Sequence, residues 1–401
     1  MNYGEGRMLR GRMQAEGIEF VTSPGEADVL VLNTCGVIGF TENTMYRRIA
    51  ELHSLGKRII VTGCLANTKQ ERIMEIAPSA SLIPPGDIRA LEMLLGLNTS
   101  GMDCWTDYSS NDIIVPIAQG CLSLCTYCFS RLSRGRVRSL EAKNVVEMIR
   151  KHLSTDGTKE ILLSAMDTIA YGRDIGTTLP ELLKQICSLE GSFRLRVGMM
   201  NPSLLPPLLD DLLDAFSDPR IYKFFHLPFQ SGSDRILRAM KRGYTAEQFI
   251  SLVREIRQRY PDMTLSTDVI TGFPGETDED FAMTLGVMEA VSPDIVNVTR
   301  FSAREGTPAF YMKEQVPGWI SKERSRAATA LRFQLSLERN RAYLGRRCTV
   351  LLTEKGKGNT TIGRLDNYKQ VVVSGIHEIG EWLECKITGC SSVHLEATPL
   401  S

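Results

Sequence analysis

The sequence predicts an α/β protein in three parts: an open α/β sheet domain, a partial (β/α)6 barrel and a small C-terminal β-barrel. Two observations lead to this fold class. As far as about residue 343, apolar strands alternate with amphipathic helices, which is typical of parallel sheets. After Leu344 the helical periodicity stops, and five short strands separated by turn signals fill residues 345–401.

The first part, residues 1–98, contains two buried strands that each run into a cysteine. We expect these strands over Ala27–Asn33 and Lys57–Thr62, followed by Cys35 and Cys64. Helices are expected over residues 7–16, 41–54 and 69–76. Because the carboxyl ends of parallel strands meet at one edge, this pattern predicts a Rossmann- or flavodoxin-like sheet whose two cysteines face one crevice and share a metal.

The composition limits the classes of protein. Lysine plus arginine and aspartate plus glutamate both number 47 among 401 residues, so the net charge is zero and any nucleic-acid surface must be a local patch. Ten cysteines in a chain of this length do not indicate a disulfide framework. No apolar run is long enough to span a membrane, and the start has no apolar signal region. We therefore expect a cytoplasmic protein.

Three cysteines lie close together at the start of the second part. Cys121, Cys125 and Cys128 have C-x3-C-x2-C spacing directly after the apolar strand Ile113–Ile117. Three ligands leave a structural zinc site incomplete, whereas a 4Fe-4S cluster can take three cysteines and leave one iron open. A zinc loop with a remote fourth ligand, or three core cysteines, remain the alternatives.

Residues 112–340 repeat a strand-then-helix pattern that predicts the partial barrel. Strands are expected near 113–117, 160–164, 194–198, 222–227, 264–270 and 295–299, with helices between them and a final helix over 321–343. Barrel chemistry lies at the carboxyl ends of the strands. Polar residues follow those ends here, at Ser164, Asp167, Asn201, His226, Gln230, Ser231, Asp268 and Arg304. Arg131, Arg134, Arg136 and Arg138 follow the cysteine loop and are expected to meet an anionic substrate.

The cysteine loop, with Tyr127 before its last cysteine, resembles the radical S-adenosylmethionine (SAM) superfamily. The resemblance implies that Cys121, Cys125 and Cys128 hold a 4Fe-4S cluster that binds SAM and cleaves it to a 5′-deoxyadenosyl radical. By the same resemblance, the residues expected to bind SAM are Tyr127, Ser164, Ser231, Asp268 and Gly272, and those expected to act in catalysis are Asp167, Gln230 and Arg304.

The stretches Asn33–Cys35 and Thr62–Cys64 resemble the N-terminal domain of the methylthiotransferases, radical SAM enzymes that install a methylthio group. In that domain three cysteines hold a second 4Fe-4S cluster. The sequence Met1–Arg7 is similar to the segment just after the first of those cysteines, so we expect the chain to start late, without the first strand. Residues 198–202, Gly-Met-Met-Asn-Pro, resemble the archaeal and eukaryotic branch of the family.

The C-terminal barrel contains Gly363–Val371, which resembles the RNA-binding TRAM module. Its basic surface is expected from Arg346, Arg347, Lys355, Lys357, Arg364 and Lys369, with Tyr368 stacking a base. The expected domains are residues 1–98, 107–338 and 341–400, with a polar linker over 97–111.

These resemblances imply a tRNA methylthiotransferase that converts N6-threonylcarbamoyladenosine beside the anticodon to its 2-methylthio derivative. The implied cofactors are two 4Fe-4S clusters and SAM. The implied partners are the tRNA anticodon stem-loop and an electron donor such as a flavodoxin or ferredoxin, with the protein itself a monomer. The alternatives are isopentenyladenosine in tRNA or a ribosomal-protein aspartate as substrate, or an RNA-binding iron–sulfur protein without turnover.

Overall fold

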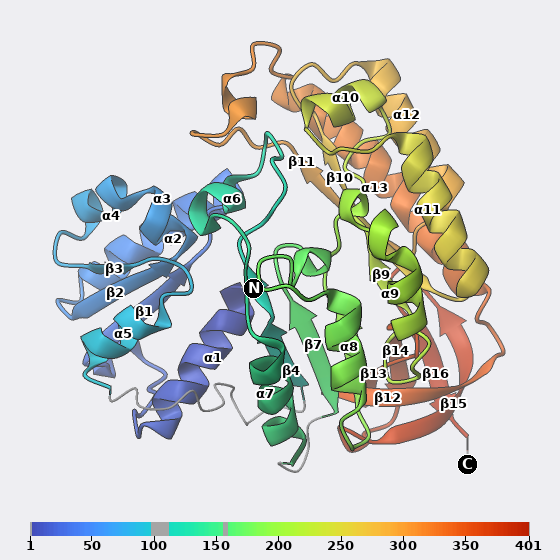
Figure 1. The fold of residues 1–401 in the computed structure, drawn as a ribbon, viewed down its shortest axis with the longest axis horizontal. Helices are drawn as coiled ribbons and strands as arrows, with labels where there is room; N and C mark the ends of the chain where they lie inside the picture. Colours follow the sequence, from blue (N-terminus) through green and yellow to red (C-terminus); the bar gives the residue numbers. More distant parts are fainter. Residues whose placement is uncertain (1, 98–111, 155–158, 401) are drawn as a thin grey trace.

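The three expected parts are visible in a computed structural model, which describes residues 2–97, 112–154 and 159–400 (Figure 1). The linker expected over residues 97–111 lies, apart from Leu97, outside the described residues. The mixed α/β class and the closed C-terminal barrel are confirmed. Within the described ranges, no helix combines the length and the apolar character needed to cross a membrane.

The first part is a three-stranded parallel sheet in the order β1-β2-β3. Ile59 and Val61 of the central strand pack in one apolar cluster with helices α2 and α4. Ile60 points to the opposite face and packs with α1 and α5, so the sheet is covered on both faces. The elements are α1 (Asn2–Ala15), β1 (Val29–Thr34), α2 (Gly39–His53), β2 (Arg58–Gly63), α3 (Cys64–Thr68), α4 (Gln70–Ile76), β3 (Ser81–Ile83) and α5 (Ile88–Leu95).

The second part is a sheet of six parallel strands that follow one another in chain order. One half is β4-β7-β8 and the other is β9-β10-β11. A parallel bridge between Leu195 and Ile221 joins the halves, and Tyr222 donates its backbone N–H to the Leu195 carbonyl at 2.9 Å. The strands are β4 (Asp112–Pro116), β7 (Glu160–Ser164), β8 (Arg194–Val197), β9 (Phe224–His226), β10 (Thr264–Thr271) and β11 (Ile295–Arg300).

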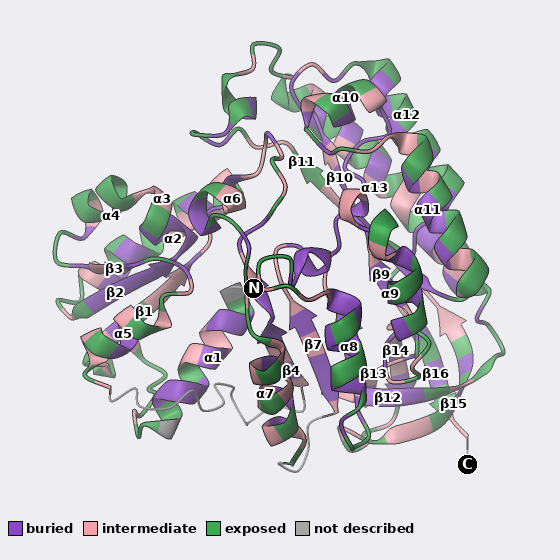
Figure 2. Ribbon diagram, viewed as in Figure 1, coloured by how far each residue is buried: buried purple, intermediate pink, exposed green. Residues whose placement is uncertain are grey.

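Helices cover the convex side of this sheet, and the strands between them are mostly buried (Figure 2). The helices are α7 (Ala142–Ser154), α8 (Leu179–Cys187), α9 (Leu209–Ala215), α10 (Asp234–Ala239), α11 (Ala246–Arg259), α12 (Asp278–Val291) and α13 (Gly318–Arg341). A small hairpin of β5 (Ala118–Gln119) and β6 (Arg138–Ser139) encloses α6 (Phe129–Arg134) and the cysteine loop.

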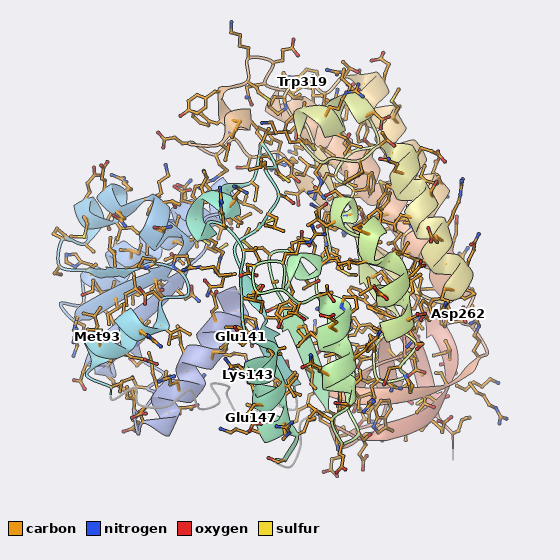
Figure 3. All side chains as sticks on the ribbon, viewed as in Figure 1. Met93, Glu141, Lys143, Glu147, Asp262 and Trp319 are labelled. Carbon is orange, nitrogen blue, oxygen red and sulfur yellow. The ribbon has the colours of Figure 1, made fainter. Side chains whose placement is uncertain are left out.

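The third part is a closed barrel in the order β12-β13-β14-β16-β15. It packs below the amino-terminal ends of the central strands, at the end opposite the cysteine loop (Figure 1). The Lys369 ammonium pairs with Asp294 at 2.6 Å, and Asn367 donates to the carbonyl of Asp262 at 2.7 Å, a residue labelled in Figure 3. The strands are β12 (Arg347–Lys355), β13 (Thr360–Arg364), β14 (Gln370–Ser374), β15 (Trp382–Cys390) and β16 (Leu395–Pro399).

Candidate active site

The cysteine loop is held at its base by the β5–β6 hairpin. Gln119 pairs with Arg138, and the Cys121 N–H donates to the Gly135 carbonyl at 3.1 Å. Gly120 has φ +71° and approaches so closely that a Cβ there would lie 1.9 Å from the Arg136 carbonyl oxygen. The loop conformation therefore depends on this glycine.

The tip of the loop is fixed by backbone contacts with two other segments. Thr126 donates its N–H to the Met240 carbonyl at 3.1 Å and its hydroxyl to the Ala239 carbonyl at 2.9 Å. The Ala309 N–H donates to the Thr126 carbonyl at 3.0 Å. The loop is thus held in place between α10 and the short helix Pro308–Tyr311.

The sulfur atoms of the loop receive hydrogen bonds. The Ser123 N–H donates to Cys121 Sγ at 3.3 Å, and Arg242 Nη1 donates to Cys125 Sγ at 3.3 Å. Burial raises the pKa of Cys121, and it raises the pKa of Cys128 to about 11, so these two thiols are protonated without a metal. Thiolates in a metal centre are stabilised by such donors, so this loop fits a cysteine-ligated cluster.

A single metal ion and an iron–sulfur cluster differ in the spacing of the cysteines that hold them. Within the described ranges, no group of three His, Cys, Asp or Glu side chains is arranged to hold a single ion. An iron–sulfur cubane binds each cysteine to a different iron, so its ligands stand further apart than those of one ion.

Arg242 is the central residue that sequence reasoning missed. Besides Cys125, its guanidinium donates to Asn201 Oδ1 at 3.1 Å and to the Pro228 carbonyl at 3.0 Å. The Asn201 amide in turn donates to Ser123 Oγ at 2.6 Å, back in the cysteine loop. The sequence Lys241-Arg242-Gly243 indicates a turn, but the burial of Arg242 cannot be read from the sequence.

Asp167 lies beside this network, after β7. Its Oδ1 accepts the Asn201 N–H at 2.9 Å, while its Oδ2 is buried and has no partner among the described residues. Burial raises the pKa of Asp167 to about 6. Ser164 Oγ and Gln230 Oε1 are also buried without a partner among those residues. Buried polar atoms of this kind need a ligand or water to complete their bonding.

Gln230 and Asp268 lie together on neighbouring strands. Gln230 has φ +70°, and its N–H donates to the Asp268 carbonyl at 2.8 Å. The Asp268 carboxylate contacts His226 Nε2 at 3.2 Å and accepts from Asn297 at 2.7 Å. Although burial opposes it, these partners lower the pKa of Asp268 below its usual value. The predicted ligand-binding carboxylate is therefore ionised and oriented.

Ser231 and Gly272 have mainly structural contacts. Ser231 is fully buried, and its hydroxyl accepts the Ser233 N–H at 3.2 Å. The Gly272 N–H donates to Glu276 Oε2 at 2.7 Å, and a Cβ at Gly272 would lie 2.6 Å from the Ser321 side chain. The adjacent Phe273 ring is 6.4 Å from that of Tyr127, which places this turn beside the cysteine loop.

Cys35 and Cys64 directly follow residues paired across the first sheet, Thr34 and Gly63. The Thr34 hydroxyl donates to the Thr62 carbonyl at 2.7 Å, which holds the two turns together. Cys64 begins a short helix, α3, whereas the sequence predicted a helix only from residue 69. The expectation that both cysteines face one crevice is consistent with this pairing.

Two arginines of the second part reach these cysteines. Arg134 makes a buried bidentate ion pair with Glu5 at 2.5 and 2.8 Å, and although burial opposes it, Glu5 and the neighbouring Cys64 raise the pKa of Arg134. Arg304 pairs with Glu42. Burial lowers the pKa of Arg304, and the charge of Cys35 acts in the opposite direction. Arg304, which was predicted to be catalytic, thus lies near Cys35.

Phe129 connects the two cysteine regions. It directly follows Cys128, its ring lies 4.7 Å from the Arg304 guanidinium, and a Cβ at Gly36 would approach that ring to 3.0 Å.

The prediction that the whole arginine run contacts substrate is wrong in part. Arg134 is buried in an ion pair, and Arg131 donates to loop carbonyls, including that of Ser123 at 2.7 Å.

The C-terminal barrel uses two of its predicted RNA-contact residues for docking. The prediction that Tyr368 stacks a base is wrong, because its ring packs against those of Tyr222 and Phe224 at 4.9 and 5.1 Å. Lys369 is buried in its pair with Asp294, so it adds nothing to a basic surface. Arg346 and Arg364 pair with Asp262 and Glu354 at 3.4 and 3.1 Å. The exposed cations Arg347, Lys355 and Lys357 remain available for RNA.

A cavity of about 750 Å³ lies where the three parts meet. Cys35 and Asn33 line it from the first part, Glu160 and Leu162 from β7, and Tyr368 from the C-terminal barrel. The cavity therefore extends from Cys35 along the concave face of the central sheet to the C-terminal barrel.

Family profiles cover the three parts of the chain. Residues 115–288 match the radical SAM superfamily, residues 1–84 match the uncharacterized protein family UPF0004, and residues 341–400 match the TRAM domain. A solved radical SAM methyltransferase, TsrM from Kitasatospora setae, has the same fold with a TM-score of 0.55 at 15% identity, covering 71% of this chain and 67% of its own. Fold and cysteine loop together define a radical SAM protein, a class that uses SAM and a 4Fe-4S cluster.

Relatives along the full length define the family more closely. A protein of Pyrococcus abyssi named probable threonylcarbamoyladenosine tRNA methylthiotransferase is 40% identical over 98% of this chain and 96% of its own. A Methanocaldococcus jannaschii protein of the same name is 35% identical over 99% and 94%. A tRNA-2-methylthio-N(6)-dimethylallyladenosine synthase of Carboxydothermus hydrogenoformans is 33% identical over 99% and 96%. The chain belongs to the radical SAM methylthiotransferase family.

Proposed function

We propose that this protein is a tRNA methylthiotransferase that converts N6-threonylcarbamoyladenosine at position 37, beside the anticodon, to its 2-methylthio derivative. The supporting observation is the junction at Phe129, where the loop of Cys121, Cys125 and Cys128 meets the turns of Cys35 and Cys64. Radical formation and sulfur transfer need two such sites close to one substrate. The full-length archaeal relatives are named for this substrate, which supports its assignment here.

The proposed roles of the residues follow from their contacts. Cys121, Cys125 and Cys128 hold the SAM-binding 4Fe-4S cluster, and Cys35 and Cys64 contribute to an auxiliary 4Fe-4S cluster that presents sulfur. When bound, the first cluster and SAM supply the radical that removes hydrogen from an otherwise unreactive C2–H bond. Arg242 holds the loop and Asn201 in fixed relation. Tyr127, Ser164, Ser231, Asp268 and Gly272 form or shape the SAM site.

Asp167 and Gln230 are proposed to face the substrate or SAM, because each has a buried oxygen without a partner among the described residues. Arg304 is assigned to the auxiliary site, since it lies at Cys35. The domains are proposed as residues 1–98, 107–338 and 341–400. The partners are the anticodon stem-loop and an electron donor of flavodoxin or ferredoxin type, and the chain acts as a cytoplasmic monomer.

A second candidate substrate is isopentenyladenosine, because relatives named for the dimethylallyl base are 33% identical to this chain over nearly its full length. Incubating the reduced enzyme with SAM and stem-loops carrying either base, then detecting the 2-methylthio nucleoside by mass spectrometry, separates the two. Product only from the isopentenyl stem-loop would overturn the proposed substrate.

Iron and acid-labile sulfide per chain after anaerobic reconstitution test the two-cluster proposal. We expect about eight irons in the wild type and about four in the Cys121→Ala/Cys125→Ala/Cys128→Ala variant. A matched Cys35→Ala/Cys64→Ala variant is also expected to keep about four. Only four irons in the wild type, all lost in the first variant, would refute the auxiliary cluster. Absence of 5′-deoxyadenosine from the reduced wild type would instead favour a binding protein without turnover.

A further inference from the structure

The guanidinium of Arg196 lies over the ring of Tyr368, a residue that lines the 750 Å³ cavity, and its side chain has no ion-pair or hydrogen-bond partner within the described ranges. Arg196 lies on β8 opposite Leu162 of β7 in the parallel register, while Arg194 lies opposite Glu160. Residues paired in this way point to the same face of a sheet. Because Leu162 and Glu160 line the cavity, the Arg196 side chain lies on the cavity side.

Two aromatic rings hold the Arg196 guanidinium. Its Cζ lies 4.6 Å from the ring centroid of Phe224 and 4.7 Å from that of Tyr368, which itself lines the cavity. Its Nε is buried and has no hydrogen-bond partner among the residues that the structure describes. A guanidinium stacked in this way is pre-organised, and its planar fork suits a carboxylate bound through two parallel hydrogen bonds.

The other charged groups around the cavity are already engaged. Arg7 pairs with Asp112 at 3.0 Å, and Glu354 accepts from Arg364 at 3.1 Å. Glu160 accepts the Tyr222 hydroxyl at 2.7 Å, and burial raises its pKa, which weakens its repulsion of an anion. Arg10 lines the cavity but is exposed and lies over Phe20 at 5.2 Å. Among the described residues next to the cavity, Arg196 is thus a half-buried cation that has no charged partner and can bind a ligand.

The candidate substrates differ in the group that such a cation would recognise. The threonylcarbamoyl arm ends in a carboxylate, whereas the isopentenyl arm is apolar. Cys35 lines the same cavity as Tyr368, so one cavity can hold the base near the auxiliary site and the arm near Arg196. We propose that Arg196 binds the carboxylate of the threonylcarbamoyl group and thereby sets the specificity for this base. This inference rests on the proposed function.

Binding of labelled anticodon stem-loops to the full chain, followed by fluorescence anisotropy, tests Arg196 without turnover. Stem-loops carry threonylcarbamoyladenosine, isopentenyladenosine or unmodified adenosine. We expect the wild type to bind the threonylcarbamoyl stem-loop about 10- to 100-fold more tightly than the unmodified one, the range of a charge-assisted hydrogen-bonded contact. Arg196→Gln is expected to lose this preference and to bind all three with the wild-type affinity for unmodified RNA.

Two further variants make the test specific. Arg196→Lys keeps the charge without the fork and is expected to retain a reduced preference. Arg10→Gln removes an arginine that lines the cavity and is expected to keep the full preference. A full preference in Arg196→Gln would overturn the assignment of Arg196 alone. A wild type that prefers the isopentenyl stem-loop would overturn the proposed substrate as well. Equal affinity of Arg196→Gln and wild type for unmodified RNA confirms that the variant is folded.

Discussion

Replacing Arg242 by glutamine is expected to lower the reduction potential of the cluster that we propose is held by Cys121, Cys125 and Cys128. The guanidinium lies 3.3 Å from Cys125 Sγ. Two unit charges at that separation interact by about 5 kcal/mol at an effective dielectric constant near 20. An added electron is shared by the whole cluster, so roughly 2 kcal/mol is a conservative value for the stabilisation lost. For a one-electron couple this corresponds to a potential about 90 mV more negative.

An EPR-monitored redox titration of the reconstituted protein measures this shift. The Cys35→Ala/Cys64→Ala background leaves one cluster to observe. Arg238→Gln is the matched control, since Arg238 is exposed on α10, the same helix that precedes Arg242. Iron content is measured in each sample. A potential for Arg242→Gln within about 20 mV of the control, with iron content retained, would refute the idea that this cation stabilises the reduced cluster.

Three further predictions concern the folded chain without cofactors. Burial raises the pKa of Asp167 to about 6, so the native state binds its proton more tightly than the unfolded state. In urea titrations the unfolding free energy of the wild type should therefore fall by about 2 kcal/mol relative to Asp167→Asn as the pH rises from 4 to 6, and equal slopes would contradict this. Lys369→Met removes the nearer of the two cations that pair with the buried Asp294, the other being Arg339, and should cost about 2–4 kcal/mol in the same assay. An unchanged unfolding free energy would contradict this. Gly63 has φ +90°, and a Cβ there would lie 2.3 Å from a strand carbonyl oxygen. Gly63→Ala should therefore have a melting temperature well below that of the control Gly56→Ala, where a Cβ meets no atom within 4 Å. Equal melting temperatures would exclude backbone strain at Gly63.

The architecture was accessible from the sequence because periodicity reports burial on a regular element. The six central strands and the five strands of the small barrel were all expected near their observed positions. The short strand Ser81–Ile83 was not assigned, because three residues carry too little periodicity. The eight-residue helix Ile88–Leu95 was not assigned either. The early start of the helix at Cys64 was missed because its first residues have no capping side chain to signal it.

The site was only partly accessible, because the use of a charged side chain depends on its partners in space. The cysteines could be chosen from spacing alone. Arg134 was expected to meet an anionic substrate, but Glu5, which lies far from it in sequence, pairs with it and makes it a buried structural cation. Arg242 and Arg196 gave no periodic signal, since their roles come from loops and rings that only the tertiary fold brings together. Tyr368 failed as a base-stacking candidate for the same reason.

The small C-terminal barrel is docked too firmly to act as a mobile tether. Its Lys369 pairs with Asp294, its Asn367 reaches the Asp262 carbonyl, and its Asp366 carbonyl accepts the Lys223 N–H at 2.9 Å. RNA bound by this module would therefore reach the cavity at a fixed distance and in a fixed orientation. On that basis the protein would measure the anticodon stem as well as recognise a base, and a stem lengthened by one base pair would present its nucleotide out of register.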